Sequence, residues 1–280
     1  MTGSSCNVAI RKVDISRQWE TTDQVAAEEP LEIQVSSQIA AGAAAKSVSI
    51  TMRTPGNDRE LALGFLFTEG IIQAAEQIIS VENIGQPDVH SGLRNIVRVE
   101  TSPDVDLDLE RLQRHFYTTS SCGVCGKASL DALRVSGQVS LANQVTVFSP
   151  EMLLGLPAAI RELQPVFAKT GGLHAAAIFG PDGEIEIVRE DVGRHNATDK
   201  VIGALLEQGR IPAHRKGLFV SGRASFELMQ KALVAGIPLL AAVGAPSSLA
   251  VEMAKEFGMT LAGFLREGTF NIYAGAGRIG

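Results

Sequence analysis

The sequence predicts an α/β protein in which a C-terminal α/β domain follows a smaller α+β domain. In the second half of the chain, short apolar segments of strand length alternate with longer segments of helical spacing. The run Pro181-Asp182-Gly183 is a strong turn signal between two strand-like segments, which predicts a hairpin. The composition agrees, because 45% hydrophobic and 20% charged residues over 280 positions are ordinary values for a globular chain.

The first half predicts a small mixed unit. Residues 1–27 carry only weak patterning, and residues 28–140 form the smaller domain. Alternating residues predict strands at LEIQVS (31–36), KSVSITMRT (46–54), IISVENIG (78–85) and NIVRVETS (95–102). A helix is expected after Asn57 or Asp58, either of which can cap it, and Gly70 marks its end. Helical spacing also marks DLDLERLQRHF (106–116) and ASLDALRV (128–135).

Residues 141–280 predict the larger domain. Pro150 after Ser149 fits a helix start, and this helix is expected to run to about Gln164. The hairpin AAAIFG/EIEIVRE follows, then a helix over 196–208. Three further strands are expected at GLFVSG, IPLLAAVG and TLAGFL, with helices at SFELMQKALVAG and SSLAVEMAKEFG between them and a last strand at FNIYAG. This order predicts several parallel neighbours in one sheet.

Charge and hydropathy argue against several classes of protein. The net charge of −6 gives no basic field for nucleic acid. The N-terminal residues do not resemble a signal peptide, and no apolar run approaches the roughly 20 residues of a membrane span. We therefore expect a cytoplasmic protein that binds neither nucleic acid nor membrane.

The most informative stretch is SSCGVCGKASL (120–130), which holds Cys122 and Cys125, two of the three cysteines. Four interpretations compete: two buried small residues, half of a zinc site, a redox dithiol, or a sulfur carrier that holds a persulfide. One pair supplies only two of four zinc ligands, so no metal site is expected. Gly123 and Gly126 give the loop the freedom that a shuttling thiol needs.

Three expected strand ends offer a ligand edge, because ligands of open α/β sheets bind beyond the carboxyl ends of strands. They are Ser221-Gly222-Arg223, Gly244-Ala245-Pro246-Ser247 and Arg266-Glu267-Gly268. Their small residues and arginines suit phosphate, although they can equally serve only to end strands and cap helices. Two interpretations are open for the polar run from Arg189 to Asn196. It could position a ligand or the cysteine loop, or it could be a solvated loop whose Asp191 or Asn196 caps a helix. The roles of His174 and His195 are left open; a structural role is favoured for His174.

These motifs resemble the formate dehydrogenase accessory sulfurtransferase (FdhD) family from about Pro30 to the C-terminus. The similar stretches are SSCGVCGKASL, ELALGFLFTEGII, TGGLHAAAIF, REDVGRHNATDKVIG, VSGRASFELMQKALVAGIP and GAPSSLAVEMAKEFGMTLAGFLREGTFNIYAG. The resemblance implies a sulfurtransferase that passes sulfur from a cysteine desulfurase to the bis-molybdopterin guanine dinucleotide form of the molybdenum cofactor, which formate dehydrogenase then receives. It also implies a homodimer and a fold related to cytidine deaminases.

The resemblance assigns roles to individual residues. Cys122 corresponds to the persulfide-bearing cysteine and Cys125 to its partner. The family's cofactor-binding stretch corresponds to Phe264, Leu265, Arg266, Glu267, Gly268 and Thr269. A non-catalytic chaperone for the molybdenum cofactor is the alternative. Zinc-dependent deamination is not expected, because Ala176 stands where the H-x-E motif needs its glutamate and no proline precedes Cys122.

Overall fold

The computed structural model describes residues 3–37, 45–89, 91–105 and 140–280. Its larger sheet has six strands in the order β12-β11-β10-β9-β7-β8. The bounds are β7 His174–Phe179, β8 Ile185–Asp191, β9 Gly217–Val220, β10 Leu239–Ala242, β11 Thr260–Arg266 and β12 Thr269–Ala274. Strands β9, β10 and β11 are parallel neighbours, whereas β7, β8 and β12 pair antiparallel. The predicted α/β sheet and its hairpin are therefore confirmed.

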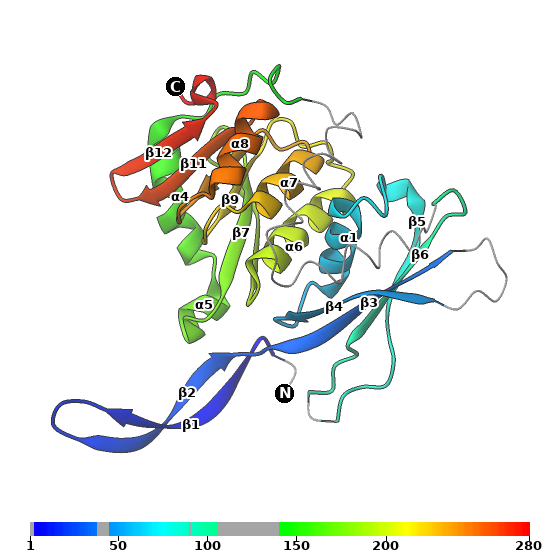
Figure 1. The fold of residues 1–280 in the computed structure, drawn as a ribbon. Coiled ribbons are helices and arrows are strands. Elements are labelled where there is room, and N and C mark those ends of the chain that lie inside the picture. The colour runs from blue at the N-terminus through cyan, green and yellow to red at the C-terminus, as the bar shows by residue number, and fades with distance from the viewer. Residues whose placement is uncertain (1–2, 38–44, 90, 106–139) are drawn as a thin grey trace.

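Helices cover both faces of this sheet (Figure 1). On one face lie α6 (Arg194–Glu207), α7 (Phe226–Val234) and α8 (Ser248–Glu256), and on the other α4 (Pro150–Glu162). Side chains of each strand alternate between the two cores, as Ile178 and Phe179 of β7 illustrate. Ser149 caps α4 at the predicted helix start, and Ser247 caps α8; each accepts a hydrogen bond from a backbone amide.

The smaller sheet has the order β4-β3-β6-β5. Its strands are β3 (Glu29–Ser37), β4 (Lys46–Arg53), β5 (Ile78–Ile84) and β6 (Ile96–Thr101), each at a predicted position. Helix α1 (Asp58–Thr68) lies between this sheet and α6. The short helices are α5 (Pro165–Thr170), η1 (Ala75–Gln77) and η2 (Ala276–Arg278).

Helices α1 and α6 cross at two glycines. A Cβ atom added to Gly64 would lie 1.9 Å from the carbonyl oxygen of Asp199, and one added to Gly203 would lie 1.9 Å from that of Glu60. The absence of side chains at both positions therefore permits backbone contact between the helices. This contact makes one continuous core, since Leu31 of the small sheet and Leu240 of the large sheet belong to the same cluster of buried side chains.

The predicted cap of α1 is wrong in its chemistry. Asn57 precedes the helix in the left-handed conformation, and its side chain makes no capping hydrogen bond. Asp58 instead forms an ion pair with the buried Arg53, with 2.8 Å between Nη2 and Oδ2. Glu60, at the spacing from Asn57 that a capping box uses, instead binds Arg189 of β8, with 2.6 Å between Oε1 and Nη2. These acidic side chains serve tertiary contacts, which a local capping pattern does not reveal.

Residues 5–26 form an element that the sequence patterning did not predict. Strands β1 (Ser5–Val13) and β2 (Gln18–Ala26) pair antiparallel over their whole length and form a two-stranded sheet of their own. This ribbon extends away from the rest of the molecule (Figure 1). Among the described residues, no helix is long and apolar enough to cross a membrane.

Candidate functional site

The predicted cysteine loop lies outside the described residues. Cys122, Cys125 and the helical segments expected at 106–116 and 128–135 all fall between residues 106 and 139. Of the predicted site, the described residues contain the strand ends at the predicted ligand edge and the elements around them.

Two of the three predicted strand ends meet as expected. Because β9 and β10 are parallel neighbours, their carboxyl ends share one edge of the sheet. The amide of Gly244 donates to the carbonyl of Gly222 at 2.9 Å, and the amide of Ala224 donates to the carbonyl of Ala245 at 3.2 Å. A Cβ atom on Gly244 would lie 2.8 Å from the Gly222 oxygen, so the close contact of the two loops needs glycine.

The third strand end also lies at this edge. Strand β11 is the parallel neighbour of β10 and turns back through Glu267 and Gly268 into β12, the predicted last strand. Phe264 has a φ of 55°, in the left-handed region that only glycine adopts readily, and its amide donates to the Gly244 carbonyl at 3.1 Å. Such strained residues cost about 1–3 kcal/mol and cluster at functional sites. The strain at Phe264 is thus consistent with a binding role for this turn.

The six predicted cofactor-binding residues have different environments. Leu265 is 1% exposed and packs in the core on the α4 side, so its side chain is not accessible at the turn. Arg266, Glu267, Gly268 and Thr269 are exposed. The Arg266 guanidinium lies 5.5 Å from the centre of the Phe264 ring. The exposed turn and its arginine remain available to an anionic ligand, and cofactor binding here stays a prediction.

The edge also contains the start of α6 and of β7. His174 opens β7, and its ring packs beside Gly222: a Cβ atom added there would lie 3.5 Å from the ring. Helix α6 starts at Arg194 after Gly193, which offers no side-chain cap. Within the described part of the chain, the buried atoms Arg194 Nε and His195 Nε2 have no hydrogen-bond partner. Polar atoms in such positions usually have a partner, and a helix N-terminus favours an anion.

Burial and positive neighbours keep both histidines neutral. Burial lowers the pKa of His195 from 6.5 to about 4, and Arg194 and Lys231 lower it further in the same direction. Burial, followed by Arg194, also lowers the pKa of His174. At neutral pH the imidazoles can therefore donate or accept hydrogen bonds without charge, and the charged groups beside them are Arg194 and Glu227, whose Oε2 lies 4.0 Å from His195 Nε2.

We expect His195 to remain neutral well below the pH at which an ordinary histidine titrates. Because its pKa is lower in the folded than in the unfolded chain, protonation favours unfolding. This contribution to stability is complete above about pH 6.5 and is lost as the pH falls toward 4. An NMR titration of the ring protons, with His195→Gln to identify the signal, measures this. A midpoint at or above 6.5 would contradict the described environment.

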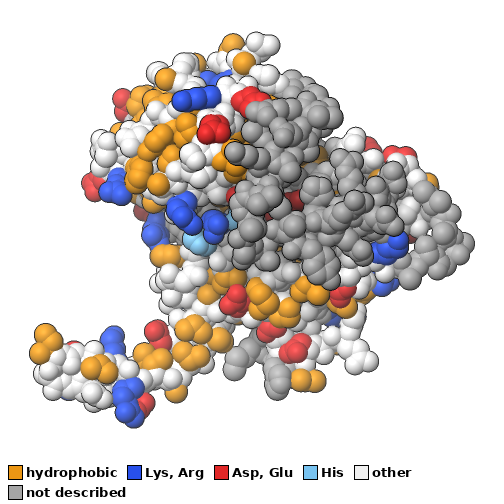
Figure 2. Space-filling model, viewed as in Figure 1, with side chains coloured by type: hydrophobic (Ala, Val, Ile, Leu, Met, Phe, Trp, Pro, Cys, Tyr) orange, Lys and Arg blue, Asp and Glu red, His pale blue; other side chains and the backbone are white. Residues whose placement is uncertain are grey.

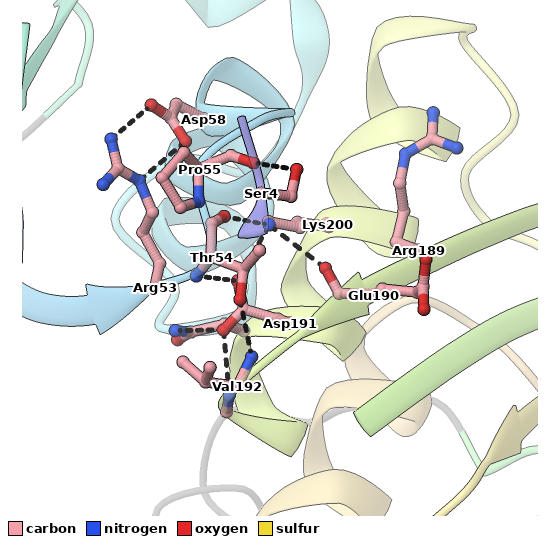
Figure 3. A network of polar contacts seen from close by, with 12 residues as sticks. Ser4, Arg53, Thr54, Pro55, Asp58, Arg189, Glu190, Asp191, Val192 and Lys200 are labelled. Atoms are coloured by element: carbon pink, nitrogen blue, oxygen red, sulfur yellow. Dashed lines mark hydrogen bonds and ion pairs between the residues drawn. The ribbon is translucent and has the colours of Figure 1, made fainter. Parts of the chain in front are cut away.

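A buried network holds the start of α6 in place (Figure 3). Lys200 Nζ lies 2.8 Å from Asp191 Oδ2, and their side chains are 1% and 0% exposed. Lys200 also donates to the carbonyl of Thr54 at 2.9 Å. Asp191 accepts from the amides of Thr54 and Gly193 at 3.1 and 2.9 Å. The pair therefore fixes the β8–α6 turn against the segment between β4 and α1.

Of the two predicted alternatives for residues 189–196, the solvated loop with a side-chain cap is wrong, and a role in ordering a ligand or the cysteine loop stays a prediction. The run is not a solvated loop, since Asp191 and Asn196 are buried and neither caps α6 by a side-chain bond. Asn196 Nδ2 donates to the Met52 carbonyl at 2.8 Å and to Asp191 Oδ1 at 3.0 Å. The run joins the two sheets, and Arg194 and His195 lie at the edge, at the start of α6. Lys200 was missed because a lysine in a helix ordinarily faces solvent.

Comparison with known proteins places the chain among proteins of similar sequence and fold. The model of the FdhD/NarQ family matches residues 26–280. A sulfur carrier protein FdhD of Mycolicibacterium paratuberculosis is 53% identical over 256 residues, covering 90% of each chain. That of Streptomyces avermitilis is 51% identical over 259 residues, covering 92% of this chain and 89% of its own.

A solved structure has the same fold over nearly the whole chain. The crystal structure of a proposed formate dehydrogenase accessory protein from Desulfotalea psychrophila matches with a TM-score of 0.74 and 22% identity, and the match covers 98% of this chain and 99% of that one. The family model and the sequence relatives agree with the predicted resemblance. This chain belongs to the FdhD/NarQ family.

Proposed function

We propose that this protein is a sulfur carrier in the maturation of formate dehydrogenase. Cys122 takes sulfur from a cysteine desulfurase as a persulfide, and the protein passes it to the bis-molybdopterin guanine dinucleotide form of the molybdenum cofactor in the cytoplasm. The main support is that relatives about half identical over some nine-tenths of the chain are sulfur carrier proteins by name. The cysteine pair falls within the residues that the family model matches.

The first step is an exchange between two sulfur atoms. The Cys122 thiolate attacks the outer sulfur of the donor's persulfide, and the sulfur–sulfur bond of the donor breaks. The donor leaves as a thiolate, and Cys122 now carries the additional sulfur. A sulfurtransferase of this kind needs no metal for the step. Cys125 either resolves the persulfide or supports the loop.

The ligand edge fits the phosphates of a guanine dinucleotide substrate. Positive groups at this edge of the sheet are the start of α6, the exposed Arg266, and Arg194, whose Nε has no hydrogen-bond partner among the described residues. Figure 2 shows Lys and Arg side chains gathered beside a histidine on this face of the molecule. We propose that Phe264 and residues 266–269 bind the substrate through this turn, that the protein is a homodimer, and that its larger domain is related to cytidine deaminases.

A chaperone that only shelters the cofactor is the alternative, and the two cysteines distinguish it from a carrier. In cells lacking their own copy of the protein, the double variant Cys122→Ala/Cys125→Ala is expected to leave formate dehydrogenase activity at the level of cells without the gene. Cys6→Ala, outside the loop, is the matched control and should restore full activity. Full activity with the double variant would establish the chaperone and exclude the carrier.

A further inference from the structure

The β1–β2 ribbon, here called the arm (residues 5–26), has one face on which five of eight side chains are apolar, here called the apolar face, and a more polar opposite face. Side chains alternate along each strand, and antiparallel partners point to the same side. The register pairs Cys6 with Val25, Val8 with Asp23, Ile10 with Thr21 and Lys12 with Trp19, which places these eight side chains on one face. The opposite face carries the exposed ion pair between Arg11 and Glu20, at 2.8 Å. The arm therefore has the amphipathic pattern of a sheet that packs against another layer.

No second layer covers the arm within the described chain. Its two strands form a separate sheet that touches the rest of the molecule near its root, where Ser4 Oγ donates to the Pro55 carbonyl at 3.1 Å and α5 contacts β2. Ile15 at the tip is fully exposed, and Val25 on the apolar face is 39% exposed. A lone two-stranded ribbon is marginally stable in water and needs packing against another element. The arm thus requires a partner for its apolar face.

An apolar surface of the body lies next to the root of the arm. Ile50 and Met52 of β4 are 70% and 47% exposed and, two residues apart, point outward from the small sheet. Strand β4 leads directly to Pro55, whose carbonyl accepts a hydrogen bond from Ser4, the residue that precedes the arm. Figure 2 shows apolar side chains along the arm and on the adjoining body. Apolar side chains that are exposed side by side mark interaction surfaces.

We propose that the arm of each protomer lies across the Ile50–Met52 face of a second copy of this chain. This inference specifies the interface of the proposed homodimer. Nine residues per strand give the arm a length of about 30 Å, and two strands a width of about 10 Å, so one face covers roughly 300 Å². Each docked arm then removes about 600 Å² from water, counting both surfaces. Two reciprocal arms remove about 1,200 Å², which reaches the size of a specific interface.

The area argues for a second copy rather than a different protein. A single arm on a different protein would bury only about 600 Å², which is below the size of a stable complex. A two-fold axis doubles the buried area, because the arm of each protomer then covers the β4 face of the other. The same surfaces then meet twice in one closed dimer.

The arm contains the single tryptophan of the chain, which makes the proposal directly measurable. Trp19 lies on the apolar face, so its emission reports on contact with the second copy. The test variants are Ile10→Glu on the arm and Ile50→Glu on the proposed receiving face. Thr22→Glu is the matched control, since Thr22 lies one residue from the partner of Ile10 but on the polar face. Thermal unfolding followed by circular dichroism verifies that the body of each variant is folded.

Sedimentation and fluorescence at micromolar protein should agree. We expect a wild-type dimer whose Trp19 emission shifts to longer wavelength on dilution. Ile10→Glu and Ile50→Glu should each raise the dissociation constant about 30-fold or more, as at a binding hot spot, and Thr22→Glu should leave it unchanged. A wild-type monomer would contradict the homodimer itself. If both glutamate variants remain dimers with unchanged Trp19 emission, the arm is not the dimer interface. The same conclusion follows if the arm binds only a different protein. Neither result would contradict the proposed sulfur carrier.

Discussion

Cys122→Ala is expected to take up no sulfur from a persulfide-loaded cysteine desulfurase, while Cys125→Ala still takes up one atom. Without the Cys122 thiolate, no group is assigned to attack the outer sulfur of the donor, so labelling should fall to background. The measurement is transfer of radioactive sulfur from cysteine to the purified protein through the desulfurase. Both substitutions remove one sulfur atom from the same loop, so each serves as the matched control of the other.

The outcome separates the role of Cys122 from loss of structure. The two variants should unfold at the same denaturant concentration as the wild type if the substitutions act on chemistry alone. Labelling that persists in Cys122→Ala, or that disappears only in Cys125→Ala, would transfer the carrier role to Cys125.

Lys200→Met is expected to lower the free energy of unfolding by about 3–5 kcal/mol. The substitution removes the cation from a fully buried ion pair and leaves the Asp191 carboxylate charged inside the protein. The lost bond to Thr54 also loosens the contact between the β8–α6 turn and the small sheet. Most of this loss in the free energy of unfolding comes from the buried Asp191 charge that no longer has a cation beside it, and less comes from the lost hydrogen bond to Thr54.

Urea unfolding measures this effect, and two further variants control it. Lys255→Met replaces an exposed lysine on α8 and should change the free energy by no more than about 0.5 kcal/mol. The double variant Lys200→Met/Asp191→Asn should recover part of the loss, because neither remaining side chain is charged. A Lys200→Met protein as stable as the wild type would show that the pair does not hold the turn.

The sequence predicts the C-terminal layers well because strong local signals coincide there. Short buried strands such as Gly217–Val220 are continuous apolar runs, and serine caps precede the helices at Pro150 and Ser248. The parallel order then brings the loops after β9 and β10 together without any knowledge of side-chain contacts. The fold class and the meeting of these strand ends are therefore predictable from patterns that span only a few residues.

Contacts between distant segments were not predictable in the same way. Asp191 and Lys200 are charged, so the sequence predicts that they face solvent. Both are buried instead, and they form an ion pair with each other and hydrogen bonds with the backbone of Thr54. Phe264 adopts a left-handed conformation that nothing in its residue type suggests. The two strands of the arm contain polar residues at many alternating positions, so their sequence alone gives no clear strand signal.

The most direct test of the sulfur relay is mass spectrometry of the wild-type protein after incubation with a cysteine desulfurase and cysteine. We predict a gain of one sulfur atom, about 32 Da, on the peptide that contains Cys122 and Cys125, and its loss on treatment with a reductant. An unmodified peptide, under conditions in which the desulfurase itself carries a persulfide, would contradict the assignment of this protein as a sulfur carrier.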